Sequence, residues 1–187
     1  AMLIYGPWWL MIAGILIMCF ALAYSAGPYP LSHHGLGDIA VIIFFGVVPV
    51  VLTWYLQTSS WDSVGPVAAT SLAIGLLASN VLVVNNYRDM EDDASVGKRT
   101  TVVIFGRKVM GVVYLLSGFI GMSVMIPVWL GMPVWVFAVP LIYLALHVKT
   151  WYSLRQSAGA AINPLLGRTA MNLLVFALLF AVTCLLS

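Results

Sequence analysis

Charged side chains are scarce in this sequence. Only 7% of its 187 residues are Asp, Glu, Lys or Arg, whereas 63% are hydrophobic. About a quarter of the residues in a soluble globular domain are charged, so the composition excludes that class. The net charge of +2 is too small to indicate nucleic-acid binding, and we expect no nucleic-acid partner.

Cysteine is also rare. The two cysteines, Cys19 and Cys184, lie inside apolar runs and lack the spacing of a metal site. Isolated thiols in apolar surroundings usually behave as small hydrophobic residues. We therefore interpret both cysteines as buried packing residues.

Long apolar segments dominate the sequence instead. Repeated runs of about 20 residues, the length that a helix needs to cross the hydrocarbon core, predict an all-α, polytopic transmembrane bundle. We expect one transmembrane domain over residues 1–187, with helices at 8–24, 38–57, 66–87, 108–127, 133–152 and 168–186. The first apolar run begins almost at Ala1, so we expect the domain to be N-terminally truncated.

The basic residues predict how this domain is oriented. All eight lie on one side of the six-helix alternation, and the opposite connections, 58–65 and 128–132, contain none. By the positive-inside rule the basic side is cytoplasmic, and both chain ends face outward. We expect an integral protein of the bacterial cytoplasmic membrane. An interfacial belt of tryptophans at the outer ends agrees with this orientation: Trp8, Trp9, Trp54, Trp61, Trp129 and Trp135.

The connection at residues 25–38 is cytoplasmic by the same count but contains no Lys or Arg. It carries His33, His34 and Asp38 instead, which suits a loop that serves a ligand. Adjacent histidines cannot share one helical face, so a two-histidine metal pair is not expected. We expect Asp38 to cap the second helix.

Two other polar residues lie in predicted helices. We expect His147, near the cytoplasmic end of the fifth helix, at the membrane interface. Asn172 lies inside the apolar last helix and is expected either to face a ligand or to bond a neighbouring helix.

Nine of the charged residues gather between Arg88 and Lys108. Ionisable residues are costly next to a bilayer, and their default interpretation there is a functional site. We expect this cytoplasmic loop, residues 88–107, to carry the chemistry of the domain.

Helical spacing within this region places three oxygen-bearing side chains together. If the third helix continues, Asn85, Asp89 and Asp93 stack on one face about 6 Å apart. One amide and two carboxylates suit Mg²⁺, which proteins usually hold with one or two carboxylates plus substrate phosphates. The following turn, residues 97–100, adds Lys98 as a point charge for a polyanion such as diphosphate.

A solvated loop is the alternative interpretation of the same charges. In that case Arg88 pairs with Asp92 at i, i+4, and the run serves only solubility. Two consecutive asparagines, Asn85 and Asn86, at a helix end are a poor choice for solubility alone. The pattern leaves both interpretations open.

The sequence also resembles a known family. The run from Asn85 to Asp93, followed by Gly-Lys-Arg-Thr at 97–100 and Phe-Gly-Arg at 105–107, resembles the second aspartate-rich motif of the UbiA-type membrane prenyltransferases. The similarity is strongest to the MenA type, the 1,4-dihydroxy-2-naphthoate polyprenyltransferases of menaquinone biosynthesis. Further matching stretches lie in the same order along the chain, at residues 27–31, 34–38, 44–46, 54–57 and 163–169.

The resemblance implies a bundle of nine transmembrane helices with a cavity open to the cytoplasm and to lipid. The six helices expected here correspond to family helices four to nine. In the family, two aspartate-rich motifs hold Mg²⁺ on the diphosphate of an isoprenoid donor, and the first motif has no counterpart in this chain. We therefore expect the chain to hold half of a metal site and to be inactive alone.

The resemblance also implies roles for individual residues. Asp89 and Asp93 match catalytic, metal-binding positions, and Asn85 is expected as a further Mg²⁺ ligand. Lys98 matches a basic position near the diphosphate. The other expected substrate contacts are Arg88 and Arg99 to the diphosphate, Tyr87 to a developing cation, and His34 to the acceptor. For Tyr87 the alternative is packing, and for His34 it is exposure to water.

The implied reaction moves a polyprenyl group from its diphosphate to 1,4-dihydroxy-2-naphthoate with loss of CO₂. A different aromatic acceptor, such as 4-hydroxybenzoate, homogentisate or a porphyrin, is a first alternative. A cation-coupled transporter that uses Asp89 and Asp93 is a second one. Transporters place such charges near the bilayer midplane and carry internal repeats, whereas this sequence does neither.

Overall fold

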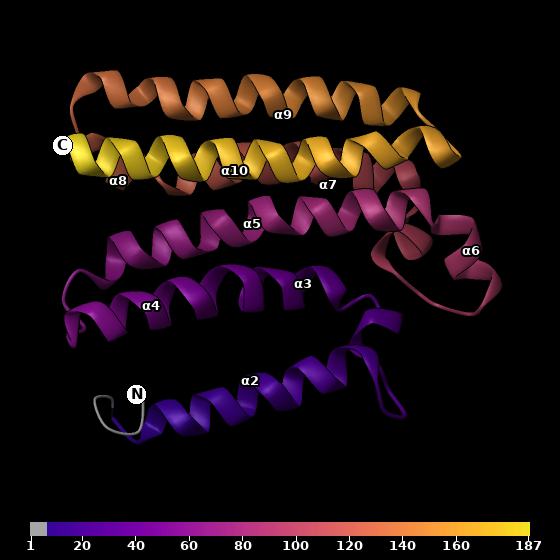
Figure 1. The fold of residues 1–187 in the computed structure, drawn as a ribbon. Helices are drawn as coiled ribbons and strands as arrows, with labels where there is room; N and C mark the ends of the chain where they lie inside the picture. The colour runs from indigo at the N-terminus through magenta and orange to yellow at the C-terminus, as the bar shows by residue number, and fades with distance from the viewer. Residues whose placement is uncertain (1–6) are drawn as a thin grey trace.

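The protein is an all-helical bundle in the computed structural model, which describes residues 7–187 (Figure 1). The chain passes along the bundle six times, and consecutive passes run in opposite directions. The first three passes are α2 (Trp9–Ser25), then α3 (Gly37–Val41), the π-helix η2 (Ile42–Val47) and α4 (Val48–Thr58) in one rod, and then α5 (Val64–Arg88). The short helix α6 (Met90–Ser95) precedes α7 (Thr101–Val124), α8 (Ile126–Leu130), α9 (Ala138–Gln156) and α10 (Asn163–Leu186). Three 3-10 turns complete the order: η1 (Leu31–His33), η3 (Val134–Phe137) and η4 (Gly159–Ile162).

The predicted polytopic helical bundle is confirmed. Five passes are 22 to 30 residues long and apolar enough to cross a membrane, and α2 is an apolar helix of 17 residues. The length and composition of these helices indicate an integral membrane protein.

Two helices begin earlier than predicted. α7 begins at Thr101, seven residues early, because the Thr100 hydroxyl accepts a hydrogen bond from the third amide of the helix and caps it. α10 begins at Asn163, five residues early. Its Pro164 lies in the first turn, where a missing N–H costs no helical hydrogen bond.

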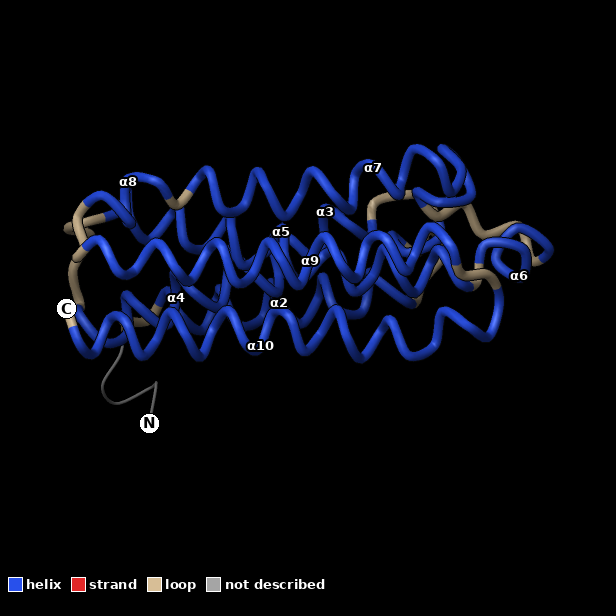
Figure 2. Tube along the Cα trace, turned by 90° about the horizontal axis from the view of Figure 1, so that it is seen from above, coloured by secondary structure: helices blue, strands red, loops and turns tan. Residues whose placement is uncertain are grey.

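α5 lies at the centre of the bundle, between η2 on one side and α7 and α10 on the other (Figures 1 and 2). Two hydrophobic cores, one towards each end, join α5 to α7, α9 and α10. α2 lies at the edge, and Leu10 is its one buried residue among those described. Cys19 in α2 and Cys184 in α10 are exposed on these outer helices, so the prediction that both are buried is wrong.

η2 and α5 approach each other closely. A Cβ atom on Gly46 would lie 2.3 Å from the Cα of Gly75, and one on Gly75 would lie 2.6 Å from the carbonyl oxygen of Ile42. Any larger side chain would force the two backbones apart. Small residues permit this contact, as at many membrane helix interfaces, and the contact fixes the rod of α3, η2 and α4 against α5.

Polar side chains inside the α7–α9–α10 region bond to one another. His147 is 1% exposed and stacks between Tyr114 and Tyr143, at centroid distances of 4.6 and 5.5 Å. Its Nε2 lies 3.0 Å from the Tyr114 carbonyl oxygen. The interfacial position predicted for His147 is therefore wrong. Asn172 donates to the Thr150 hydroxyl at 3.0 Å and so joins α10 to α9. Of its two expected roles, the bond to a neighbouring helix is therefore the one observed.

The two ends of the bundle differ in chemistry. α2 begins and α10 ends at the end that carries α8, while α6 lies at the opposite end (Figure 1). The segments that flank α6 in the sequence carry Arg88, Lys98, Arg99 and Arg107. At the first end, Trp9, Trp54, Tyr55 and Trp61 form an aromatic cluster. Trp129 does not belong to such a belt, because it is 1% exposed and packs within the hydrophobic core.

Candidate functional site

The site begins where α5 gives way to α6. The predicted helix does not continue unbroken past Tyr87, because Asp89 has φ −91° and ψ 10° and separates the two helices. The hydrogen-bond register nevertheless continues, since the Asp89 amide donates to the Asn85 carbonyl at 3.0 Å and the Asp93 amide to the Asp89 carbonyl at 2.8 Å. The three residues therefore keep the four-residue spacing on which the predicted oxygen face depends.

Arg88 holds two of these three residues. Its guanidinium donates to both carboxylate oxygens of Asp89, at 2.6 and 2.7 Å, and to Asn85 Oδ1 at 2.9 Å. It also reaches Asn163 Oδ1 at the start of α10, at 3.2 Å. The hydrogen bonds from Arg88 hold the pKa of the Asp89 carboxyl below its usual value. The solvated-loop interpretation required Arg88 to pair with Asp92, and Arg88 does not form that pair.

Asp93 is the buried member of the group. It is 7% exposed, and its Oδ1 accepts a hydrogen bond from Lys98 Nζ at 2.9 Å. The turn that returns Lys98 to Asp93 depends on Gly97, whose φ of +75° favours glycine. Asp93 Oδ2 is buried and has no hydrogen-bond partner among residues 7–187. A buried carboxylate oxygen without a donor fits a position that a cation or a ligand fills.

The donor set fits a divalent cation that shares its coordination with a ligand. No three acidic, histidine or cysteine side chains of the described residues are close enough to form a metal site of their own. Asn85, Asp89 and Asp93 supply only oxygens, and a cation held by two carboxylates would take its remaining ligands from phosphate and water.

A second charged group ties this segment to α7. Arg107 donates to both Glu91 carboxylate oxygens at 2.6 Å and to the Tyr87 carbonyl oxygen at 3.0 Å. These bonds hold the pKa of Glu91 below its usual value. Arg107 follows Gly106, whose φ of 78° and ψ of 160° break α7 and aim Arg107 at the end of α5. The Arg107 guanidinium lies 5.5 Å from the centre of the Tyr87 ring.

A polar cavity of about 200 Å³ lies between this segment and the loop that precedes α3. The Arg99 amide donates to the His33 carbonyl at 2.9 Å, so the two loops are hydrogen-bonded to each other. Gly35, with φ +73°, lets the first loop pass Ile104 closely. The cavity is lined by Tyr24, Ser32, Gly35, Gly37, Asp38, Leu82, Asn85, Asn86, Lys98, Thr100 and Thr101.

Asp38 is a cavity residue of the loop that was expected to serve a ligand, but the sequence assigned it only a helix-capping role. It lies in the first turn of α3, and its side chain does not cap that helix, contrary to the prediction. Instead, the Thr101 hydroxyl donates to its Oδ2, while Oδ1 is buried without a partner among the described residues. The sequence does contain a signal for this role, because Asp38 is a lone carboxylate at the start of an apolar helix.

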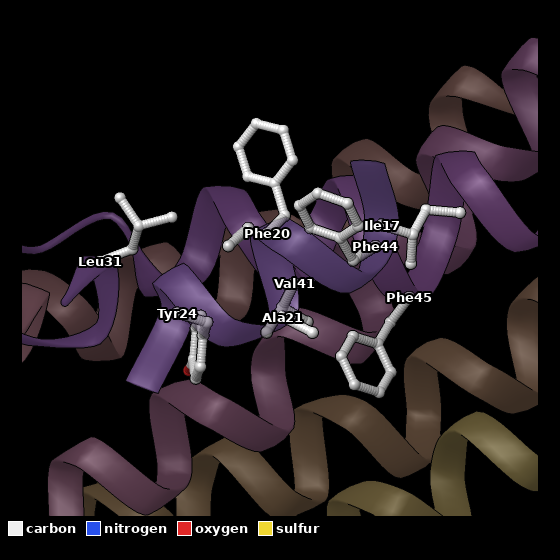
Figure 3. A pocket seen from close by; sticks show the side chains of 9 residues that line it. Ile17, Phe20, Ala21, Tyr24, Leu31, Val41, Phe44 and Phe45 are labelled. Carbon is white, nitrogen blue, oxygen red and sulfur yellow. The ribbon is translucent and has the colours of Figure 1, made fainter. Parts of the chain in front are cut away.

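Two apolar cavities lie between α2 and the rod of α3, η2 and α4. They measure about 430 and 400 Å³, and Tyr24 lines both the first of them and the polar cavity. Phe20, Phe44 and Phe45 surround the first apolar cavity, as Figure 3 shows. A molecule with an anionic head and a long hydrocarbon chain therefore has matching surfaces side by side.

The structure brings some of the predicted substrate residues together and leaves others outside. Lys98 and Asn85 line the polar cavity. Tyr87 packs in the hydrophobic core, and the Arg99 side chain is exposed. His34 Nδ1 lies 2.8 Å from the Pro30 carbonyl oxygen and its ring stacks on Tyr29, so its contacts shape the loop rather than line the cavity.

Comparison with known proteins gives consistent matches. The model of the UbiA prenyltransferase family matches residues 1–176. The 1,4-dihydroxy-2-naphthoate octaprenyltransferase of Escherichia coli is 35% identical over 95% of this chain and 58% of its own length. The protein of the same name from Mycobacterium leprae is 31% identical over 96% of this chain and 60% of its own length. The one from Haemophilus influenzae is 47% identical over 50% of this chain and 30% of its own length.

These alignments cover at most about 60% of each of these three relatives. No solved structure matches the chain.

Proposed function

Since the chain belongs to the UbiA prenyltransferase family, we propose that the full-length protein transfers a polyprenyl group from its diphosphate to 1,4-dihydroxy-2-naphthoate, in menaquinone biosynthesis. One observation carries the proposal: a polar cavity lined by Asn85 and Lys98 shares Tyr24 with an apolar cavity of about 430 Å³. This juxtaposition matches a polyprenyl diphosphate, whose anionic head and apolar tail need opposite surroundings.

The aspartate-rich segment would hold Mg²⁺ through Asn85, Asp89 and Asp93. When bound, the ion neutralises the negative charge that develops on the departing diphosphate. The unpartnered Oδ2 of Asp93 supports this assignment. Arg88 now bridges Asn85 and Asp89, and it is placed to turn its guanidinium to the diphosphate when the carboxylate binds the cation.

Lys98 receives the diphosphate in this proposal. Its ammonium lies between the Asp93 carboxylate and the polar cavity, so it neutralises an anion there without leaving the segment. Arg99, the next residue in the same turn, has an exposed side chain, and its positive charge attracts the anion towards the cavity. The polyprenyl chain lies along the cavities between α2 and η2, where the walls exclude water from the reacting carbon.

The electron-rich ring attacks the allylic carbon, and the carbon–oxygen bond to the diphosphate breaks. With 1,4-dihydroxy-2-naphthoate, attack at the carboxylate-bearing carbon leads to loss of CO₂. The basic residues at the α6 end support an orientation in which the site, on residues 88–107 and the loop before α3, faces the cytoplasm at the bacterial inner membrane.

An assay of membranes that contain the full-length protein tests this function. Octaprenyl diphosphate would be supplied with 1,4-dihydroxy-2-naphthoate, 4-hydroxybenzoate or homogentisate, with Mg²⁺ or with a chelator. We expect Mg²⁺-dependent prenylation of the naphthoate, with one CO₂ released per product. Product from the benzoate alone would refute the acceptor, and no product from any acceptor would refute the transferase.

A further inference from the structure

Asp38 holds a carboxylate oxygen that no described residue uses. Its Oδ2 accepts the Thr101 hydroxyl, and its Oδ1 is buried without a donor. Leaving a buried acceptor unpaired is destabilising, and more so when the group is charged. The Thr101 bond holds the side chain in this position although the loop and α7 are far apart in sequence. An oxygen fixed in this way needs a donor from a ligand.

The polar cavity has two chemically different walls. Lys98 and Asn85 form the wall next to Asp93, and Lys98 is paired with that carboxylate at 2.9 Å. Asp38 and Thr101 form another part of the lining. Lys98 suits an anion, whereas the free oxygen of Asp38 suits an O–H donor. The lining of the cavity therefore offers a cation to the diphosphate and an oxygen acceptor to a hydroxyl group.

Size restricts what reaches Asp38. The polar cavity measures about 200 Å³, less than the roughly 300–1,000 Å³ usual for sites that enclose drug-sized ligands. A space of this size admits compact polar groups rather than a hydrocarbon chain. Asp38 also lines a mainly apolar cavity between α5 and α7, so an aromatic ring whose hydroxyl meets Asp38 has an apolar wall beside it.

We infer that Asp38 is a catalytic residue that accepts the proton of the acceptor hydroxyl, and that Thr101 is the positioning residue that holds it. The inference rests on the proposed function. As the ring carbon forms its bond to the allylic carbon, the carbon–oxygen bond to the diphosphate breaks and the diphosphate leaves with the electron pair. The neighbouring hydroxyl becomes a carbonyl, and its proton passes to Asp38 Oδ1.

The same residue completes the reaction of the naphthoate. Attack at the carboxylate-bearing carbon leaves a β-keto carboxylate next to the new carbonyl. When this group loses CO₂, the electrons of the breaking carbon–carbon bond move to the carbonyl oxygen. That oxygen takes the proton back from Asp38, which returns to its ionised form. Protons and charges balance without an oxidant or a further base.

The test uses the full-length enzyme in membranes and four variants. Asp38→Asn keeps the shape and removes the base, Thr101→Val removes the positioning hydroxyl, and Thr101→Ser keeps it. Asp62→Asn, at an exposed acid whose carboxylate accepts from Ser60, is the matched control. Measurements are kcat, the KM for octaprenyl diphosphate, the Mg²⁺ concentration for half-maximal activity, and the thermal unfolding midpoint.

We expect Asp38→Asn to lower kcat at least about 100-fold, the usual worth of a general base. The KM for octaprenyl diphosphate and the Mg²⁺ midpoint stay near those of the wild type, because the base does not touch the metal. Thr101→Val lowers kcat about tenfold through one lost hydrogen bond, and Thr101→Ser restores it. Asp62→Asn behaves like the wild type.

An acceptor whose hydroxyl next to the carboxylate-bearing carbon is methylated separates the base from a structural role. This methyl ether carries no proton to transfer, so it slows the wild type strongly and slows Asp38→Asn no further. An additional loss with Asp38→Asn, or a shifted Mg²⁺ midpoint, would overturn the inference. If Asp38→Asn is as active as the wild type, the role of Asp38 is refuted but the proposed function stands. If the wild type prenylates no naphthoate, the proposed function is refuted as well.

Discussion

The α7–α9–α10 side of the bundle and the α2–α3–η2 side treat buried polar atoms in opposite ways. On the first side, His147, Thr150 and Asn172 bond to partners within the protein. On the second, Asp38 keeps a buried carboxylate oxygen without a partner among the described residues, as does Asp93 in α6 at the end of the bundle. Packing follows the same division, because both hydrophobic cores join α5 to the first side, whereas apolar cavities of about 430 and 400 Å³ lie on the second. An incompletely bonded carboxylate thus marks the candidate site, whereas the uncharged amide nitrogen of Asn80, between α5 and α7, also lacks a partner among the described residues.

The largest effect should come from removing a carboxylate of the proposed metal site. Asp89→Ala or Asp93→Ala in the full-length enzyme should lower activity about 1,000-fold, since a bound cation contributes several kcal/mol. Asp92→Ala, at an exposed neighbour in the same helix, is the control and should stay within about threefold of the wild type. Membrane content by immunoblot and prenyl transfer by product analysis measure this difference. Near-normal activity of either variant would contradict the metal assignment.

A substitution in the tightly packed side should affect stability instead. A Cβ on Gly118 would lie 2.4 Å from the His147 ring, so Gly118→Ala should lower the free energy of unfolding by about 1–3 kcal/mol. Gly14→Ala in α2 meets no atom within 4 Å and should be neutral or stabilise by up to about 1 kcal/mol. Thermal unfolding in detergent compares the two. Equal effects would show that the two sides do not differ in packing.

Filling the cavity beside α2 should alter which donors react. Ala21 lines the first apolar cavity, and Ala21→Trp should lower turnover with octaprenyl diphosphate about tenfold relative to geranyl diphosphate, because the longer chain loses its space. Ala23 is exposed on the same helix and lines none of the cavities described above, so Ala23→Trp is the control. Kinetics with donors of increasing length measure the ratio. An unchanged ratio would place the chain elsewhere.

The smallest effect should come from the internal bond of Asn172. Asn172→Ala should cost about 0.6 kcal/mol, with about 1.7 as an upper value for such bonds. Thr150→Val should cost a similar amount, and the double variant should cost little more than either one, because both remove the same bond. Unfolding free energies of the three variants provide this cycle. Fully additive losses would mean that the bond contributes nothing.

Features that depend on nearby residues could be predicted from the sequence. The apolar runs indicated the six passes, and four-residue spacing indicated that Asn85, Asp89 and Asp93 share a register. Lys98 lies only five residues after Asp93, so their proximity also follows from a local turn. These predictions succeed because backbone geometry alone sets short-range neighbours.

Features that depend on distant residues could not be predicted. Asp38 meets Thr101 across 63 positions, and nothing near either residue records that contact. His147 and Trp129 were assigned to interfaces because hydropathy reports depth in the membrane, not which face of a helix meets its neighbours. The space beside Gly118 that admits the His147 ring exists only after α7 and α9 pack. One sequence without its relatives does not contain that information.

The π-helix η2 has a consequence for the two halves of its rod. A π-turn accommodates one residue more than an α-turn, so it offsets the helical phase of α3 from that of α4 by about 100°. The π-helix therefore sets the membrane-facing direction of α4 independently of the direction in which α3 presents Asp38. Gly46, within the π-helix, packs this junction against α5. Deleting a single residue from Ile42–Val47 would restore an ordinary helix and rotate Asp38 away from Thr101, while α4 kept its place.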